Sequence, residues 1–405
     1  MSNQQPPLIL VTRFSVFSPK AGGLRIRQEF GADPKEFERM LFDPARLDTR
    51  LDILKNLALP SYSQIAKEFN LFHLVQYSKN LPAEYIDELH ALGEQYEFLK
   101  PVEVEDSSMY DSVVDFLQKY EASFRGVFAW ARVDDDDILS TSYFRTVKHY
   151  LSNEFVGMAI SFPTQAATLY SNGLVADVRN QFVRNPSAGQ TYVGRFNQSL
   201  HTVESIGFVA HHDVDKYVPT VVDPTVVGSL QMLHSTQDTS SFKTPIGGRL
   251  INRATQLSSY SEMDRELVAY EFPALLQRSR FAEYEKTDGF EIKPDELLNL
   301  APDALREGRA YRLEFEFDAS SKIQDGCSIS FQFSNRNQAD GHFPWTERRH
   351  HYLRLHADNS NSGSEFFVLP KGATLESIGL NIDRQGLHVD LVRLWLRESG
   401  PLDTA

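Results

Sequence analysis

The chain has 405 residues, which is too long for one small domain and makes two domains the natural expectation. It carries 55 acidic and 41 basic side chains, and the formal net charge of −14 argues against a surface for non-specific binding of nucleic acid or an anionic membrane. Any bound phosphate must be met locally, by a few Arg or Lys side chains or by a divalent metal. The single cysteine, Cys327, excludes an intrachain disulfide framework and a Cys-rich zinc site, and it favours a reducing compartment.

The N-terminus lacks the pattern of a signal peptide. The segment MSNQQPPLILVTRFSVFS has no basic region before its apolar stretch, and Thr12 and Arg13 interrupt that stretch. No window reaches the roughly 18 uninterrupted apolar residues of a membrane-spanning helix. We therefore expect a cytoplasmic protein without a transmembrane segment, with peripheral association at the inner membrane as an alternative.

The first third of the chain alternates between strand and helix patterns. Residues 8–17 are β-branched and aromatic and predict a strand, and the leucines of residues 43–60 have helical spacing up to Pro60, which we expect to end that helix. Ser61 is the expected N-cap of a second, short helix, and residues 70–78 form the next predicted strand.

The alternation continues with helices at residues 82–96 and 110–120 and a strand at residues 126–133. Strands that alternate with helices predict βαβ units and a mostly parallel, Rossmann-like sheet. From about Met158 the pattern becomes strand-like and rich in loops, and residues 224–235 predict a buried strand or helix that ends at His234.

The last part of the chain has a different pattern. We expect an α/β domain over residues 1–260, a helical connection over residues 261–285 and a second domain over residues 286–405. In that second domain, short alternating segments are separated by Gly, Asn, Asp and Ser, which predicts an all-β sandwich or jelly roll. Its aromatic residues Phe343, Trp345 and Trp395 are candidates to stack on sugar rings, and a role in the core or in assembly explains them equally well.

Four consecutive aspartates, Asp134 to Asp137, follow the predicted strand 126–133 directly. If extended geometry persists, Asp134 and Asp136 project to one side, at the carboxyl end of a strand where α/β sheets bind ligands. Mg²⁺ or Mn²⁺ takes one or two carboxylates together with waters and substrate phosphates. The alternative is a solvated acidic turn in which Asp137 caps the following helix.

Four segments, VTRFSV, LPSYSQ, LVQYSKNLP and ARVDDDDIL, resemble in order and spacing the bacterial rhamnosyltransferase family of GT-A-type glycosyltransferases, over roughly residues 8–240. The resemblance implies a GT-A fold that binds a nucleotide-diphosphate sugar and transfers the sugar to a glycan acceptor. It also places the aspartates at the Asp-X-Asp motif, where Asp134 faces the ribose or the metal, Asp136 binds the metal and Asp137 supports the metal shell. His234 then becomes a candidate late metal ligand, against a structural role for a lone histidine beside apolar residues.

Arginines near these segments are candidates for donor contacts. Arg13, at the end of the first strand, and Arg50, in the first helix, are candidates to contact the nucleotide or diphosphate, and Arg132 is either a donor contact or an internal counter-charge for the aspartates. An acceptor hydroxyl also needs a proton acceptor, and the segment VAHHDVDKY offers Asp213 for that role, against a surface turn.

The resulting prediction is a metal-dependent glycosyltransferase, with Mn²⁺ or Mg²⁺ as cofactor, that acts in bacterial surface polysaccharide synthesis and has the potential to form a homo-oligomer. Two other functions stay open at this point. One is a nucleotide-sugar hydrolase with the same carboxylate site, and the other is a non-catalytic glycan-binding or scaffold protein in which the aspartates are a solvated turn.

Overall fold

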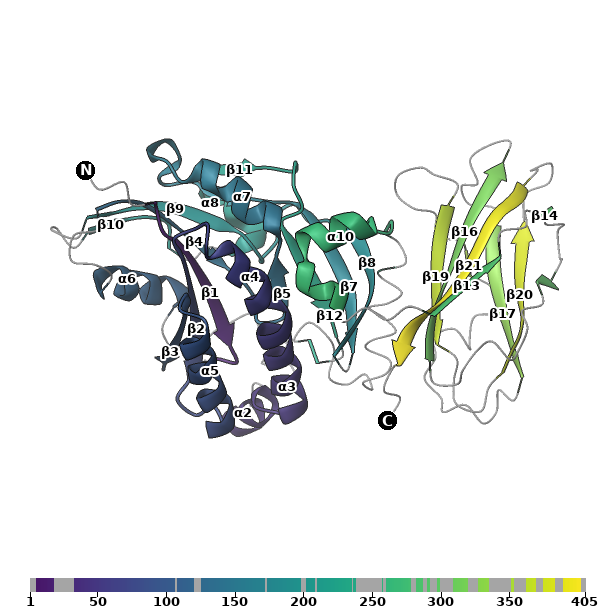
Figure 1. The fold of residues 1–405 in the computed structure, drawn as a ribbon, viewed down its shortest axis with the longest axis horizontal. Coiled ribbons are helices and arrows are strands. Elements are labelled where there is room, and N and C mark those ends of the chain that lie inside the picture. Colours follow the sequence, from purple (N-terminus) through teal and green to yellow (C-terminus); the bar gives the residue numbers. More distant parts are fainter. Residues whose placement is uncertain are drawn as a thin grey trace.

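The structure, a computed structural model, describes residues 5–17, 33–105, 108–119, 125–171, 173–197, 202–207, 210–234, 236–237, 257 and 260–277, followed by the backbone of the strands in the C-terminal part. Figure 1 shows the fold as a ribbon coloured along the chain. The predicted sugar-stacking residues Phe343 and Trp345 lie outside the described residues.

A mixed sheet forms the centre of the first part, with the strand order β11-β6-β9-β4-β1-β2-β3 and with β10 beside β9. Its first four strands in sequence pair in parallel: β1 (Leu8–Phe14), β2 (Leu71–Ser78), β3 (Leu99–Val104) and β4 (Arg125–Arg132). The sequence predicts β1, β2 and β4, whereas β3 lies between two predicted helices, where the sequence predicts no strand. The remaining strands of this sheet are β6 (Ala159–Ser161), β9 (Thr191–Asn197), β10 (Thr202–Glu204) and β11 (Thr220–Val222). The mixed α/β sheet fits the expected GT-A-like architecture.

A second, four-stranded sheet has the order β5-β12-β7-β8. Its members are β5 (Asp137–Leu139), β7 (Thr164–Ser171), β8 (Leu174–Phe182) and β12 (Ser229–Leu233). The short strand β5 follows the aspartates, so the chain passes from the central sheet to this second sheet at the acidic run.

Helices cover both faces of the central sheet. The main ones are α2 (Pro34–Leu41), α3 (Pro44–Ile53), α4 (Leu59–Ile65), α5 (Ala83–Gln95), α6 (Met109–Lys119), α7 (Thr141–Tyr150), α8 (Val214–Tyr217) and α10 (Arg265–Glu271), with short turns at η2 (Asn153–Phe155), η4 (His211–Asp213) and η5 (Pro273–Gln277). Strand β1 shows why both faces are apolar, because Leu8 and Leu10 join the core cluster that includes α3, α4 and α5, whereas Ile9 and Val11 join the cluster that includes α6. None of the helices in the described residues is both long and apolar enough to cross a membrane.

The prediction that Pro60 ends the first helix and that Ser61 caps a new one is wrong. Helix α3 continues through a π-helical turn, η1 (Leu54–Ala58), into α4, and Figure 1 shows α3 and α4 as one continuous run. The wider turn, in which the Leu59 N–H donates to the Leu54 carbonyl, lets the helix continue although Pro60 has no N–H to donate. The Ser61 hydroxyl bonds the Leu57 carbonyl instead of capping a helix.

The predicted helical connection over residues 261–285 is helical only in part. Helix α10 ends at Glu271, before Pro273, and Ala282–Lys286 forms a strand, β13. Phe272 and Leu275, which follow α10, are buried in the same core cluster as α3 and α4. The segment up to Leu275 is therefore packed into the first part of the molecule.

The C-terminal strands form two antiparallel sheets, as the alternating pattern predicts. One has the order β13-β21-β16-β19 with β14 beside β21, and the other has the order β15-β20-β17-β18. The remaining bounds are β14 (Phe290–Glu291), β15 (Leu297–Leu298), β16 (Arg309–Ala319), β17 (Cys327–Ser334), β18 (His351–Tyr352), β19 (Ser362–Val368), β20 (Thr374–Ile382) and β21 (Val389–Pro401), the last of which contains Trp395. The packing of these sheets into a sandwich, and the domain boundaries, stay predictions.

Candidate active site

The candidate site lies at the carboxyl ends of β1 and β4. These strands are parallel neighbours in which Leu8 pairs with Ala129 and Val11 with Arg132, and the Val133 N–H donates to the Val11 carbonyl (3.0 Å). Both strands therefore end at the same edge of the sheet, which is where open α/β sheets bind ligands.

The four aspartates form a β-turn, not an extension of the strand. Strand β4 ends at Arg132, and the Asp137 N–H donates to the Asp134 carbonyl (3.2 Å), which closes the turn. The chain turns here because Asp137 must begin β5, where it pairs with Gln231 of β12. The predicted alternation of Asp134 and Asp136 on one side of a strand is therefore wrong, and we refer to Asp134–Asp137 as the acidic turn.

Asp137 does not cap the following helix, so that part of the alternative is also wrong. Ser140 is the N-cap of α7, and its hydroxyl accepts from the Tyr143 N–H (2.8 Å). Nor is the acidic turn a solvated loop, because Asp135 and Asp137 are buried and the Asp136 side chain is only 13% exposed.

Arg132 is a counter-charge for Asp134. Its Nε and Nη2 atoms donate to one oxygen of the Asp134 carboxylate (2.9 and 2.7 Å), and the Ser187 hydroxyl donates to the other oxygen (3.0 Å). The Asp134 side chain is 29% exposed, which leaves this carboxylate accessible from solvent while its orientation is fixed.

Arg50 reaches from α3 to the other side of the acidic turn. Its side chain is 1% exposed and lies 3.0 Å (Nε) from the Asp135 carboxylate and 3.5 Å (Nη2) from the Asp136 carboxylate. Its Nη1 donates to the Thr236 carbonyl (3.3 Å). This arginine therefore joins the first helix, the acidic turn and the segment after β12.

His234 lies directly after β12, and its imidazole is buried. The Nε2 atom is 3.0 Å from the Asp136 carboxylate, and the Nδ1 atom is 2.9 Å from the Thr236 hydroxyl. Strand β12 pairs with β5, so the end of the apolar run that the sequence singles out is brought to the aspartates about a hundred residues earlier.

The aspartates titrate differently because their partners differ. Burial raises the pKa of Asp136, but the hydrogen bond with His234 and the charge of Arg50 outweigh burial and lower that pKa below its usual value. Burial, followed by the charges of Asp136 and Asp134, raises the pKa of Asp137 well above its usual value. A cation placed among these carboxylates would relieve their mutual repulsion.

The other site residues predicted from the sequence, Arg13 and Asp213, lie on other elements than the acidic turn. Arg13 is half-buried near the end of β1, opposite Gln76 of β2. Asp213 lies in η4, where its carboxylate is 2.6 Å from the Lys216 ammonium, and this hydrogen bond lowers the pKa of Asp213. His211 lies in the same turn, and burial lowers its pKa. The charges of Arg132 and Asp134 also act on the pKa of His211, with smaller effects.

Sequence reasoning missed two positions beside the acidic turn. Arg46 is buried one helical turn before Arg50, donates to the Ser15 hydroxyl (2.5 Å), and places its charge near Asp136. Its spacing of four residues from Arg50 is a signal that the sequence contains. Ser187 has no such signal, because its approach to Asp134 depends on the loop between β8 and β9.

The donor atoms fit a metal that arrives with a phosphate ligand rather than one held by the protein alone. Within the described residues no group of three or more His, Cys, Asp or Glu side chains is arranged to hold a metal. Asp136 and His234 together supply an oxygen and a nitrogen, and Mg²⁺ typically uses one or two carboxylates plus waters and substrate phosphates. The Thr236 hydroxyl fixes the far side of the His234 ring, as partners of metal-bound histidines commonly do.

Comparison with known families identifies the class. A family model matches residues 7–245, more than half of the chain, and makes the protein a glycosyltransferase. The chain belongs to the family that this model describes as "Putative rhamnosyl transferase", and the expected resemblance is confirmed. None of the curated proteins compared matches the chain.

Two solved structures are similar at low identity. The inositol-1-phosphate CTP transferase from T. maritima is 11% identical with a TM-score of 0.26, and the match covers 56% of this chain and 89% of that one. HddC from Yersinia pseudotuberculosis is 8% identical with a TM-score of 0.27 and the same coverage. Similarity this weak carries no argument about the function of this chain.

Proposed function

We propose that this glycosyltransferase moves a sugar from a nucleotide-diphosphate donor to a glycan acceptor with the help of Mn²⁺ or Mg²⁺. The observation that carries the proposal is the joint position of Asp136, His234 and Arg50 at the carboxyl end of β4. Buried ion pairs contribute little net stability compared with apolar packing, so a buried cluster of this kind at a ligand-binding edge favours a functional role.

The residues have separate roles in this proposal. Asp136 and His234 hold the metal, Asp134 faces the ribose or the metal, and Asp137 supports the shell. When bound, a divalent cation stabilises the negative charge that develops on the departing diphosphate. Arg50 keeps Asp135 and Asp136 in place, and Arg13 contacts the nucleotide or diphosphate from the end of β1.

The state of His234 links metal binding to a proton. When the Thr236 hydroxyl donates to Nδ1, a neutral ring carries its proton on Nε2 and donates to Asp136; when that hydroxyl accepts from Nδ1, the ring proton is on Nδ1 and Nε2 would be the metal-binding atom. The change from the first state to the second moves the ring proton from Nε2 to Nδ1 and reverses the Thr236 hydrogen bond, after which Asp136 and His234 would both be able to hold a metal.

Two residues are candidates to accept the proton of the acceptor hydroxyl. Asp213 is the sequence-based candidate, but its contact with Lys216 lowers its pKa and weakens it as a base. His211 is half-buried, its pKa is lowered by burial, and its Nδ1 atom is 2.8 Å from the Asn185 carbonyl, which leaves Nε2 as the basic atom. We therefore place His211 before Asp213.

The donor and the reaction are tested together by mass spectrometry. The protein is incubated with Mn²⁺, a panel of nucleotide-diphosphate sugars that includes dTDP-rhamnose, and a panel of glycan acceptors. An acceptor that gains one sugar supports transfer. Release of sugar to water alone, in the presence of every acceptor, supports the hydrolase alternative, and the absence of any product with intact nucleotide binding supports a non-catalytic protein.

The cellular setting follows from the proposed reaction. A glycan acceptor and a family of bacterial transferases are consistent with synthesis of a surface polysaccharide by a cytoplasmic enzyme that works at the inner membrane. The C-terminal strands then serve to bind glycan or to assemble copies of the chain.

A further inference from the structure

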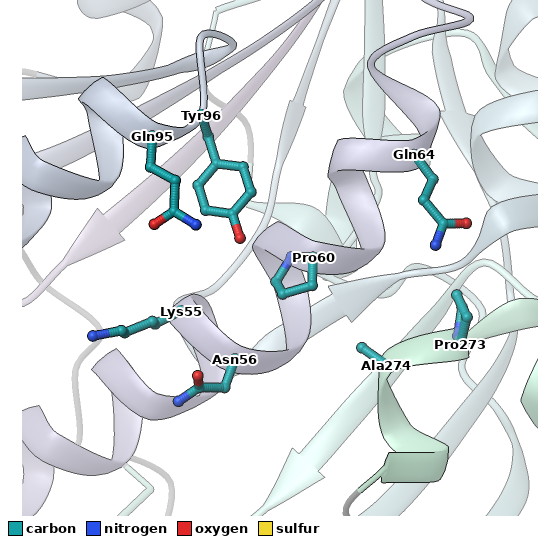
Figure 2. Close-up of a pocket in the computed structure, with 8 residues that line it drawn as sticks. All are labelled: Lys55, Asn56, Pro60, Gln64, Gln95, Tyr96, Pro273 and Ala274. Atoms are coloured by element: carbon teal, nitrogen blue, oxygen red, sulfur yellow. The ribbon is translucent and has the colours of Figure 1, made fainter.

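A pocket of about 430 Å³ lies along the π-helical turn η1 and α4, and no residue of the acidic turn lines it. Figure 2 shows the eight residues that line it, which come from three segments: Lys55, Asn56, Pro60, Gln64, Gln95, Tyr96, Pro273 and Ala274. Its volume is within the range of roughly 300–1,000 Å³ that is typical of small-molecule sites.

The lining is neutral as a whole. Lys55 is the one ionisable side chain among the eight apart from the Tyr96 phenol, and its ammonium lies 2.6 Å from the Glu88 carboxylate. No arginine lines the pocket, and arginine is the side chain that most favours phosphate and carboxylate recognition. A nucleotide or an acidic ligand is therefore a poor match for this pocket.

Three amide side chains supply hydrogen-bonding groups of both kinds. Gln64 and Gln95 are exposed and have no hydrogen-bond partner among the described residues, and the Asn56 amide nitrogen donates to the Asp52 carboxylate (2.6 Å), which leaves its oxygen to accept. Each amide offers donors and acceptors together, which suits a ligand whose hydroxyl groups also do both.

An aromatic ring and two prolines supply the apolar surfaces. In Figure 2 the Tyr96 ring extends from the end of α5 toward Pro60, and Pro273 lies with Gln64 on the other side of Pro60. The Tyr96 ring is partly buried against Phe98, with ring centroids 5.7 Å apart, so its position is supported from behind. A flat ring beside amides matches the alternating apolar and hydroxylated faces of a pyranose.

The π-helical turn places part of this lining. Lys55 and Asn56 lie within η1, and Pro60 follows it by two residues, so the irregular helix and the pocket coincide. Turns of this kind are frequent at functional sites. The same helix carries Arg50 in the turn before η1, so the pocket and the acidic turn share one rigid element.

We infer that this pocket binds a neutral saccharide, as a second site separate from the donor site. The inference uses the glycosyltransferase class of the protein and does not depend on the metal or on the roles proposed for the aspartates. The chemistry that recognises the ligand is amide hydrogen bonding to hydroxyls combined with contact between the Tyr96 ring and the C–H face of a sugar.

Saturation-transfer NMR tests the inference on the full chain. The probes are methyl α-L-rhamnopyranoside, maltotriose and xylotriose, with trigalacturonic acid as the anionic counterpart. We expect the protein to transfer saturation to at least one neutral probe, which shows that the probe binds. We expect Tyr96→Ala to weaken the binding of that probe by about ten-fold because the ring contact is lost. Tyr96→Phe keeps the ring and its packing, so it retains most of the binding.

Two further variants separate a binding defect from misfolding. The double variant Gln64→Ala and Gln95→Ala changes exposed side chains only and is expected to weaken binding, whereas Glu94→Ala, an exposed neighbour outside the lining, leaves it unchanged. Asp136→Asn is expected to keep saccharide binding within about two-fold, because neither Asp136 nor its partners Arg50 and His234 line the pocket. If the donor-site proposal fails, nucleotide binding will be unchanged in Asp136→Asn. That outcome would leave the test of saccharide binding to the pocket unaffected.

Three results would overturn the inference. They are the absence of saturation of every neutral probe, binding that is unchanged both in Tyr96→Ala and in the Gln64/Gln95 double variant, and stronger binding of trigalacturonic acid than of the neutral probes.

Discussion

Arg50 is the residue on which the geometry of the candidate site depends most. It is 1% exposed, and it contacts two aspartates and a backbone carbonyl from segments that are far apart in the sequence. Removal of one partner from a buried ion pair leaves the others uncompensated in a medium of low polarity. The contribution of Arg50 is therefore to lower the pKa of Asp136 and to hold Asp135 and Asp136 close together.

Replacement of Arg50 tests this role. We expect Arg50→Ala to lower the free energy of unfolding by about 3–5 kcal/mol, as measured by urea denaturation. Arg39→Ala, on the exposed face of α2, is the matched control and should change it by less than about 0.5 kcal/mol. An equal effect of both substitutions would contradict the role of Arg50.

His73 gives a prediction about pH. This histidine on β2 is 1% exposed, its Nε2 atom is 2.8 Å from the Thr12 hydroxyl, and burial lowers its pKa to about 3. The unfolded chain therefore binds a proton below pH 6.5 that the folded chain does not bind. The neutral, buried His73 costs no stability above pH 6.5, and the free energy of unfolding decreases as the pH falls from 6.5 toward 3.

The loss linked to His73 is about 1.4 kcal/mol for each pH unit within that window. Urea denaturation at pH 7, 6 and 5 measures it, and the variant His73→Gln should show a smaller decrease between pH 6 and 5 than the unmodified protein. Identical decreases in the two proteins would show that His73 does not titrate as described.

At the scale of elements, the acidic turn shows what a sequence pattern can and cannot predict. The strand before Asp134, the apolar run that ends at His234 and the helix with Arg50 are all visible as periodic patterns, and the structure contains them. The turn at Asp134–Asp137 is not visible, because it depends on the pairing of β5 with β12, which is nearly a hundred residues away. The continuous helix through Pro60 escaped prediction because a π-helical turn has no signature in hydrophobic spacing.

Helix α7, which follows β5, is held at its start by a carboxylate from α10. Glu271 is 3% exposed and accepts hydrogen bonds from the Ser142 N–H (2.8 Å) and the Ser142 hydroxyl (2.6 Å). Such a carboxylate satisfies a free N–H group and interacts favourably with the helix dipole.

We expect Glu271→Ala to lower the free energy of unfolding by about 1–3 kcal/mol, because the Ser142 groups are left without this acceptor. Chemical denaturation measures the change, with the exposed Glu94→Ala on α5 as a control that should stay within about 0.5 kcal/mol. A loss no larger than that of the control would show that Glu271 does not hold the helix start.

At the scale of the whole molecule, the core of the first part includes side chains from beyond the expected domain boundary. Met263, Val268, Phe272 and Leu275 are all buried in the main core cluster, beyond the expected boundary at residue 260. The sequence shows that the secondary-structure pattern changes after the α/β part. It does not show whether the short charged helix between the two parts packs against the α/β part or against the C-terminal strands.

Two truncated proteins test where this domain ends. A protein of residues 1–277 keeps these four side chains and should unfold cooperatively on heating, whereas residues 1–260 lose their burial, which is worth on the order of 6 kcal/mol. That loss is comparable to the total stability of many domains, so the shorter protein should lack a cooperative transition. Equal melting temperatures for the two proteins would place the boundary at residue 260.

Binding of a nucleotide diphosphate, measured by calorimetry with and without Mn²⁺, tests the central proposal most directly. UDP, GDP and dTDP are titrated into the protein and into Asp136→Asn, which keeps the size of the side chain but removes its charge. We predict that one nucleotide diphosphate binds only with Mn²⁺ present and that Asp136→Asn weakens that binding by about 100-fold or more. Binding that is equally tight without Mn²⁺, or unchanged in Asp136→Asn, would contradict the proposed metal and donor site.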